Sequence, residues 1–174
     1  MLFRSDLKTA VTRLGMKQVS SVVMGSVAKE LHRSKDMLYN GMMEKLWDHA
    51  LMCGVASREI AAKSGFQDVE TAFVAGLLHD IGKVVLLGIG SEVAQGHIET
   101  EEPVTEELLM EVLAEIHCET GQDLMRKWDM HDDLTGAVAF HHEPWLAEES
   151  AKLANIVNLA DFFCKKLDNA LVPE

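Results

Sequence analysis

Histidine and aspartate, two residue types that bind metal ions, recur where an α-helix would turn them toward a protein core. His49 shares a helical face with Leu46 and Cys53, because residues three and four apart lie on the same side of an α-helix. Asp161 follows Val157 by four residues within a second apolar stripe. A carboxylate on such a face is costly unless another group compensates for its lost hydration. His49 and Asp161 are therefore predicted to belong to a buried functional site and not to the solvent-exposed surface.

Two adjacent pairs extend this set. His79-Asp80 directly follows an apolar run, and His141-His142 ends a helix predicted over residues 134–142, with both rings turned inward. Several inward histidines together with two inward aspartates would leave many buried polar atoms unsatisfied without a cation. Imidazole and carboxylate ligands together suit a divalent first-row metal such as Mn, Fe, Co, Ni or Zn.

A simpler interpretation applies to isolated histidines. One inward histidine is more often a hydrogen-bonded core residue than a metal ligand. Three of the eight histidines are interpreted in this way, namely His32, His97 and His131. His32 lies near a helix end, where a cationic side chain is favoured, and the other two lie in predicted loops.

The elements that would position these residues are predicted to be helices. Apolar residues recur at helical spacing almost everywhere, and they do not alternate with polar ones as in strands. The pattern predicts an all-α, single domain over residues 1–174 with about seven or eight helices. The predicted helices are a short one with the stripe Leu7, Val11 and Leu14 between Ser5 and Gly15, and others at about 17–32, 42–63, 69–83, 108–116, 117–128, 134–142 and 149–167. Residues 88–103 are predicted to form a loop.

Composition excludes several classes of function. The chain of 174 residues has 48% hydrophobic residues and a net charge of −12, which is typical of a globular protein and disfavours binding to a phosphate backbone. No apolar run approaches a membrane span, and the first residues lack the apolar core of a signal peptide. Three cysteines without a C-x-x-C pair favour reduced thiols in a cytoplasmic protein.

Six segments resemble the HDOD domain, an output domain of bacterial signalling proteins related to the HD superfamily of metal-dependent phosphohydrolases. They are LGMKQVSSVVM, LWDHALMCGVASREIA, AFVAGLLHDIGKVVL, HCETGQDLMRKWDM, AVAFHH and LANIVNLAD. The resemblance runs from about Asp6 to the C-terminus. Because HDOD domains usually carry a further helical half before this region, the N-terminal part of a full HDOD unit is expected to be missing.

The resemblance implies a ligand set. One metal ion would bind to His49, His79, Asp80 and Asp161. A second would bind to His117, His141 and His142, with Asp80 bridging, as in the more distantly similar HD-GYP phosphodiesterases, which cleave cyclic di-GMP. The implied cofactor is thus one or two divalent ions of Fe, Mn, Zn or a similar metal. Lys83 matches the lysine that contacts the scissile phosphate, so Lys83 and Asp80 are the catalytic candidates; the alternative is an exposed Lys83 without a role.

Two departures weaken the match to the cleaving relatives. Pro144-Trp145-Leu146 stands in place of their G-Y-P loop, and Lys45 stands where some carry a metal-bridging glutamate. Cys118 is interpreted as a packing residue, because neighbours on a helix point about 100° apart.

We therefore predict a bacterial signal-transduction HDOD module that binds metal and regulates through contacts with a signalling protein or nucleotide. No contact with nucleic acid or membrane is expected. The alternatives are a metal-dependent phosphohydrolase or phosphodiesterase that acts on a (cyclic) nucleotide, and a helical domain with a vestigial site.

Overall fold

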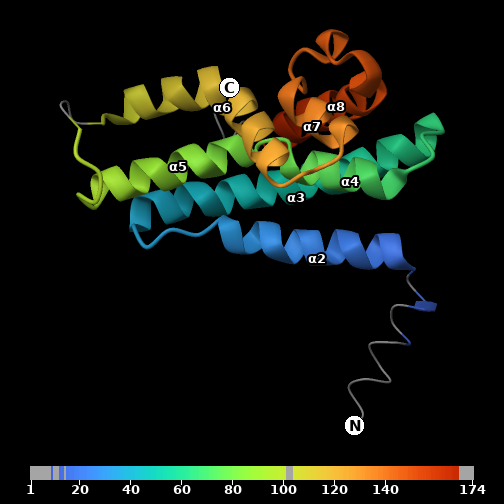
Figure 1. Cartoon of the computed structure of the whole chain (residues 1–174), viewed down its shortest axis with the longest axis horizontal. Helices are drawn as coiled ribbons and strands as arrows, with labels where there is room; N and C mark the ends of the chain where they lie inside the picture. The colour runs from blue at the N-terminus through green and yellow to red at the C-terminus, as the bar shows by residue number, and fades with distance from the viewer. Residues whose placement is uncertain (1–8, 10–11, 14, 101–103, 169–174) are drawn as a thin grey trace.

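The computed structural model describes residues 9, 12–13, 15–100 and 104–168, and within them the protein is all-α, as predicted (Figure 1). The predicted stripe of Leu7, Val11 and Leu14 lies outside the described residues. The α-helices are α2 (Met16–Leu31), α3 (Met37–Ser64), α4 (Val69–Leu78), α5 (Ile81–Ala94), α6 (Glu106–Lys127), α7 (Asp132–Ala139) and α8 (Ala151–Asp168). Two short 3-10 helices, η1 (Pro144–Leu146) and η2 (Glu148–Ser150), connect α7 to α8.

The long helix α3 is the centre of the fold. It contacts α4, α5 and α8, while α2 packs against α4. In Figure 1, α4 and α5 follow one another along one side of α3, and α6, α7 and α8 lie beyond them. Helix α6 packs on α5 and α7, and α7 packs on α8. The six helices α3 to α8 therefore form one connected body around the segment where α4 meets α5.

Local signals in the sequence set several helix ends. The side chain of Asp36 accepts hydrogen bonds from the backbone N–H groups of Leu38 and Tyr39, so α3 begins five residues before the predicted start. It ends at Gly65, whose φ of 73° is the left-handed conformation that glycine favours. Asp68 caps α4 through the backbone N–H of Thr71.

Helices α4 and α5 supply the most apolar part of the core. The stretch Val69–Ala94 is long and apolar enough to cross a membrane, which corrects the prediction that no such run exists. Its most apolar window has a mean hydropathy of 1.7, and 78% of that window is buried inside the protein. The apolar side chains are therefore accounted for by packing against the surrounding helices, as in the core of a globular protein.

Further predicted boundaries are wrong. The helix predicted over 69–83 is two helices, α4 and α5, with His79 and Asp80 at their junction. Helix α5 continues through 88–94, which the sequence predicts as a loop. The glycine at position 90 serves close packing within the helix, because a side chain there would meet the ring of Tyr39. Helix α6 is continuous across the predicted break at His117. Helix α7 ends at Ala139, so the two histidines predicted to lie on it follow it in the connection to η1.

Candidate metal centre

The structure brings together all seven predicted metal ligands and Lys83. Their positions share one property, since each lies on an element that faces the junction of α4 and α5. His49 lies on α3, His79 and Asp80 at that junction, Lys83 on α5, His117 on α6, His141 and His142 after α7, and Asp161 on α8.

The first half of the centre is built by α3, α4 and α8. His49 Nε2 lies 3.0 Å from Asp161 Oδ1, and His79 Nε2 lies 3.7 Å from the same oxygen. His79 Nε2 also lies 3.2 Å from Asp80 Oδ2. Three of the side chains that the resemblance assigns to one metal ion therefore face each other, and His79 connects them to Asp80.

The second half is built by α6 and the segment after α7. His117 Nε2 and His141 Nε2 lie 3.5 Å and 3.6 Å from Asp80 Oδ1. His117 Nε2 also lies 3.2 Å from His142 Nε2. Asp80 thus presents one oxygen to each half, which is the position that a bridging carboxylate needs.

Hydrogen bonds to the backbone orient three of the imidazoles. The Nδ1 atoms of His79, His117 and His141 lie 2.8, 2.7 and 2.8 Å from carbonyl oxygens of Gly76, Leu113 and Val138, respectively. A carbonyl can only accept, so each Nδ1 carries the proton, and in a neutral ring Nε2 then presents its lone pair to the cluster. Metal-binding histidines are typically held in this way by a bond from the other ring nitrogen.

Buried polar atoms without a partner mark the middle of the cluster. His79 Nε2, Asp80 Oδ1 and His141 Nε2 are buried and make no hydrogen bond with any described residue. Buried polar atoms in proteins almost always have a partner. A divalent cation would satisfy two imidazole nitrogens and one carboxylate oxygen at once, so the residues present fit the predicted metal.

Two lysines balance the charge of the two carboxylates. Lys83 Nζ lies 3.0 Å from Asp80 Oδ2, and Lys165 Nζ lies 3.0 Å from Asp161 Oδ2. Lys83 is only 1% exposed, so the alternative of a lysine exposed to solvent is wrong. The two ammonium groups therefore offset the two carboxylates, with the histidines left out of the count.

The carboxylates and His79 are held in charged forms. Burial raises the pKa of Asp80 and Asp161, but the nearby cations outweigh it: His79 and Lys83 hold the pKa of Asp80 well below its usual range. The hydrogen bond with His49 and the contact with His79 do the same for the pKa of Asp161. Burial lowers the pKa of His79, but Asp80 and Asp161 together raise it to about 10.

Three other histidines of the cluster, His117, His141 and His142, are held neutral. Burial lowers the pKa of His117 to about 4, and burial followed by the charge of His79 brings the pKa of His141 well below its usual value. Burial likewise lowers the pKa of His142. Neutral imidazole is the form that binds a metal ion.

Histidines outside the cluster differ from it. His32 follows α2 and is buried with its ring edge against Trp47, and burial lowers its pKa, so the predicted cationic character is wrong. His97 and His131 lie outside the helices and are exposed, as predicted.

Sequence reasoning missed two cysteines at the cluster. Cys118 Sγ lies 3.3 Å from His117 Nε2, so its interpretation as a packing residue that points away from its neighbour is wrong. Cys53 Sγ lies 3.5 Å from His49 Nε2. The signal for Cys53 was its place on the inward face of α3, whereas Cys118 gave no signal apart from its adjacency to His117.

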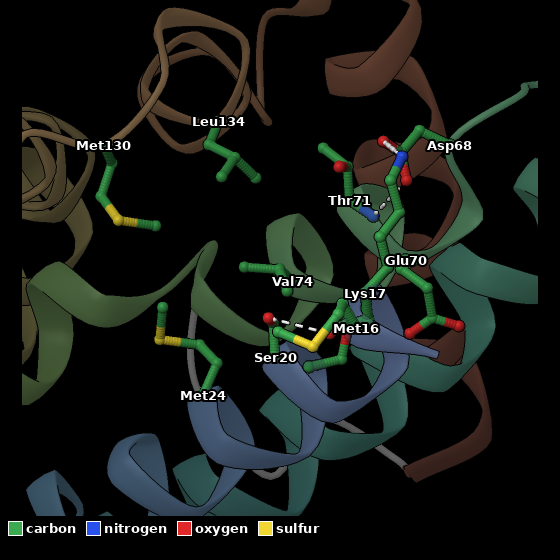
Figure 2. A pocket seen from close by; sticks show the side chains of 11 residues that line it. Met16, Lys17, Ser20, Met24, Asp68, Glu70, Thr71, Val74, Met130 and Leu134 are labelled. Carbon is green, nitrogen blue, oxygen red and sulfur yellow. Dashed lines mark hydrogen bonds and ion pairs between the residues drawn. The ribbon is translucent and has the colours of Figure 1, made fainter. Parts of the chain in front are cut away.

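Access to the cluster is limited. His49, His79, Asp80, His117, His141 and Asp161 are each at most 5% exposed, whereas Cys118 and His142 are half-buried. A hollow of about 310 Å³ lies between α2, α4 and the segment around Met130 and Leu134, with an ion pair between Lys17 and Asp68 at its edge (Figure 2). No ligand of the cluster lines this hollow.

Fold and site together define an all-α domain built around a buried histidine and aspartate cluster that fits a divalent metal. The sequence profile of the HDOD domain matches residues 5–144. The chain belongs to the HDOD family.

Relatives agree with this assignment. A crystal structure of an HDOD domain protein of unknown function from Geobacter sulfurreducens is 26% identical, with a TM-score of 0.66, over 93% of this chain and 55% of that one. A protein from Shewanella amazonensis SB2B, assigned provisionally to the metal-dependent phosphohydrolases, has a TM-score of 0.70 at 19% identity over 92% of this chain and 57% of its own, which shows the fold alone. An uncharacterized protein of Treponema pallidum (strain Nichols) is 25% identical over 94% of this chain and 32% of its own length. The chain thus spans just over half of the two solved chains and about a third of the Treponema protein.

Proposed function

We propose that this chain is a metal-binding regulatory module of bacterial signal transduction, which acts in the cytoplasm through contacts with a signalling protein. The observation that carries the proposal is the burial of six convergent candidate ligands in one cluster, whose central atoms make no hydrogen bond within the described part of the chain. Buried ligands suit an ion that stabilises one arrangement of helices. They suit less well an ion that must meet a large substrate.

One or two divalent ions of Fe, Mn, Zn or a similar metal would bind at the cluster. His49, His79 and Asp161 would hold one ion and His117, His141 and His142 the other, with Asp80 between them. Such an ion supplies Lewis acidity and a double positive charge when it is bound. The backbone carbonyls that accept from His79, His117 and His141 would keep the three rings in the binding orientation.

Helix α8 supports a link between this cluster and a protein partner. It turns Asp161 into the cluster, while Phe162 and Phe163 on the same helix are 52% and 50% exposed. Leu159 and Leu167 extend this exposed apolar face. Apolar side chains that gather on a surface are typical of sites of protein contact. A shift of Asp161 on binding metal would therefore move residues that a signalling protein could contact.

The second candidate function is a metal-dependent phosphohydrolase or phosphodiesterase that acts on a (cyclic) nucleotide. The proximity of Lys83 to Asp80 favours it, because an ammonium group beside the metal ligands could bind a phosphate oxygen. In the described structure Lys83 is instead paired with Asp80 and buried, so it would have to leave that carboxylate to meet a substrate.

Elemental analysis combined with a hydrolysis assay tests the proposal. The purified protein is stripped of metal, supplied anaerobically with Mn²⁺ or Fe²⁺, and tested for bound metal and for cleavage of cyclic di-GMP. We expect bound metal without turnover. His141→Ala should weaken metal binding by at least about 10-fold, since loss even of a residue that merely supports a ligand costs this much.

The matched control is His131→Ala, which removes an exposed histidine outside the cluster and should leave metal binding unchanged. Absence of bound metal in the wild-type protein would refute the module as proposed. Robust metal-dependent turnover that disappears in Lys83→Ala would establish the phosphodiesterase in its place.

A further inference from the structure

The half of the cluster beside α6 contains a thiol as well as three imidazoles. His117, Cys118, His141 and His142 each offer one donor atom, and the four atoms lie within 4.8 Å of one another. Two of the residues come from consecutive positions of α6, and the other two come from the segment after α7. His117 and Cys118 point about 100° apart on α6. Both can reach the site, because His141 and His142 lie over the part of the helix surface between these two directions.

The contacts of Cys118 are those of a donor. Its Sγ lies 3.3 Å from His117 Nε2 and 3.8 Å from His141 Nδ1. Because His141 Nδ1 donates to the carbonyl of Val138, His141 would bind the ion through Nε2. His117 Nδ1 donates a hydrogen bond to the carbonyl oxygen of Leu113, so its Nε2 presents a lone pair toward both the thiol and His142. A second observation points to a ligand here, because His141 is fully buried and its Nε2 has no hydrogen-bond partner among the described residues.

We infer that Cys118 completes a Zn²⁺ site with His117, His141 and His142, as its fourth protein donor in place of the carboxylate of Asp80. The inference rests on the proposed metal-binding function and specifies the metal of one half. When the ion binds, the thiol gives its proton to the solvent and a sulfur–metal bond forms. One thiolate and three imidazoles form the four-donor nitrogen and sulfur set that Zn²⁺ favours.

The two halves of the cluster consequently select different ions. The half that contains His49 and His79 has the carboxylates of Asp80 and Asp161, and oxygen donors suit harder ions such as Mn²⁺. Thiolate selects softer ions, so the half with Cys118 prefers Zn²⁺ or Co²⁺ over Mn²⁺. Cys53 lies beside the first half, with its Sγ 3.5 Å from His49 Nε2, and its thiol also interacts with Cys164, so variants of Cys53 and Cys164 are needed to distinguish its contribution from that of Cys118.

Cobalt spectroscopy tests the inference without an activity assay. Metal-free protein is titrated with Co²⁺ alone, bound cobalt is measured by elemental analysis, and the near-ultraviolet spectrum is recorded. A thiolate ligand gives a sulfur-to-cobalt charge-transfer band, which imidazole and carboxylate ligands do not give. We expect the band in the wild-type protein and its loss in Cys118→Ser, with Zn²⁺ binding weakened at least about 10-fold.

Two matched variants replace a thiol by a hydroxyl elsewhere in the core. Cys53→Ser and Cys164→Ser should both retain the band. Cobalt bound without a band in the wild-type protein would overturn the assignment of Cys118 and leave the proposed metal-binding function intact. A band that persists in Cys118→Ser would assign the thiolate to another cysteine. Absence of bound cobalt would refute both the assignment and the proposed function.

Alkylation of the wild-type protein gives an answer that does not depend on the folding of a variant. Cys118 is half-buried, whereas Cys53 and Cys164 are buried, so Cys118 is the thiol that iodoacetamide should reach first. Mass spectrometry then follows its modification with and without Zn²⁺. We expect bound Zn²⁺ to slow the modification of Cys118 at least about 10-fold, and an unchanged rate with zinc bound would overturn the inference.

Discussion

Replacing Gly82 by alanine should force α5 and α6 apart. A Cβ atom at this position would overlap the carbonyl oxygen of His117 and lie 2.7 Å from the backbone nitrogen of Gly121. Both are main-chain atoms of α6, so neither can turn away as the end of a side chain could. Gly82 lies two residues after Asp80, and the same contact therefore sets how close His117 comes to that carboxylate.

The expected magnitude follows from two opposing contributions. Alanine stabilises a helix by up to about 1 kcal/mol relative to glycine. Overpacking costs about 1–3 kcal/mol, and a clash between two backbones belongs at the upper end of that range. Gly82→Ala should therefore destabilise the protein by about 2 kcal/mol, which lowers the melting temperature by about 4–8 °C for a domain of this size.

Gly88 is the matched control, because it lies on the same helix and a Cβ there meets no atom within 4 Å. Gly88→Ala should raise stability by about 0.5–1 kcal/mol. Thermal unfolding followed by circular dichroism, with EDTA and then with Mn²⁺ or Zn²⁺, measures both variants. The rise in melting temperature on adding metal should be smaller for Gly82→Ala, because His117 moves away from Asp80. Equal melting temperatures for the two variants would refute the reasoning.

Two further predictions concern the charges of the cluster. Lys83→Met removes the cation beside Asp80, and breaking such a buried pair lowers the free energy of unfolding by about 3–5 kcal/mol. We expect a smaller loss when a metal ion is bound beside Asp80. Urea unfolding in EDTA and in Mn²⁺ measures the two losses. Equal losses under both conditions would contradict this. For the metal-free protein, stability should fall as the pH falls from about 6.5 toward 4, because the lowered pKa of His117 means that the unfolded chain takes up its proton first. His79, with its pKa raised to about 10, stays protonated in the folded state over this range. Above about pH 5.5 the unfolded chain is only partly protonated at His79, so this residue opposes the slope there and adds none below it. His117→Gln should reduce the slope of the urea midpoints against pH, and the lowered pKa values of His141 and His142 should leave a remainder.

The convergence of several candidate ligands could be predicted from the sequence because they break a local pattern, whereas His117 was assigned only through the family resemblance. A polar residue such as His49 or Asp161 within an apolar helical stripe is buried, and its lost hydration must be replaced by contacts with other polar groups or an ion. Helical periodicity is a short-range property, so it identifies the inward face without knowledge of the neighbours. The positions of these two residues on facing helices then follow from packing each apolar face against the same core.

The wrong boundaries have a different origin. Glycines at 88 and 90 were read as a loop because glycine is unfavourable within a helix. At position 90 the absence of a side chain lets α5 approach Tyr39 closely, and this packing outweighs the intrinsic preference. The contact joins residues 51 positions apart in the chain, so no local pattern reports it.

The contribution of Cys118 depends equally on tertiary structure. Neighbouring residues on a helix point about 100° apart, so a partner that packs against one face of the helix contacts only one of them. Here the connection after α7 brings His141 and His142 over α6, so residues separated by that angle both line the site. A spacing rule derived from a single helix does not include this connection.

Charge balance connects the site to the proposed regulatory role. Asp80 and Asp161 each have an ammonium partner at 3.0 Å, so the described arrangement has no unpaired buried carboxylate even without a cation. A site that relied on metal to neutralise its carboxylates would need the ion to fold at all. Here the lysines remove that requirement, while His141 Nε2, which has no hydrogen-bond partner among the described residues, would still bind an ion. A domain that folds with or without its metal has two states for a partner to distinguish, as a regulatory module requires.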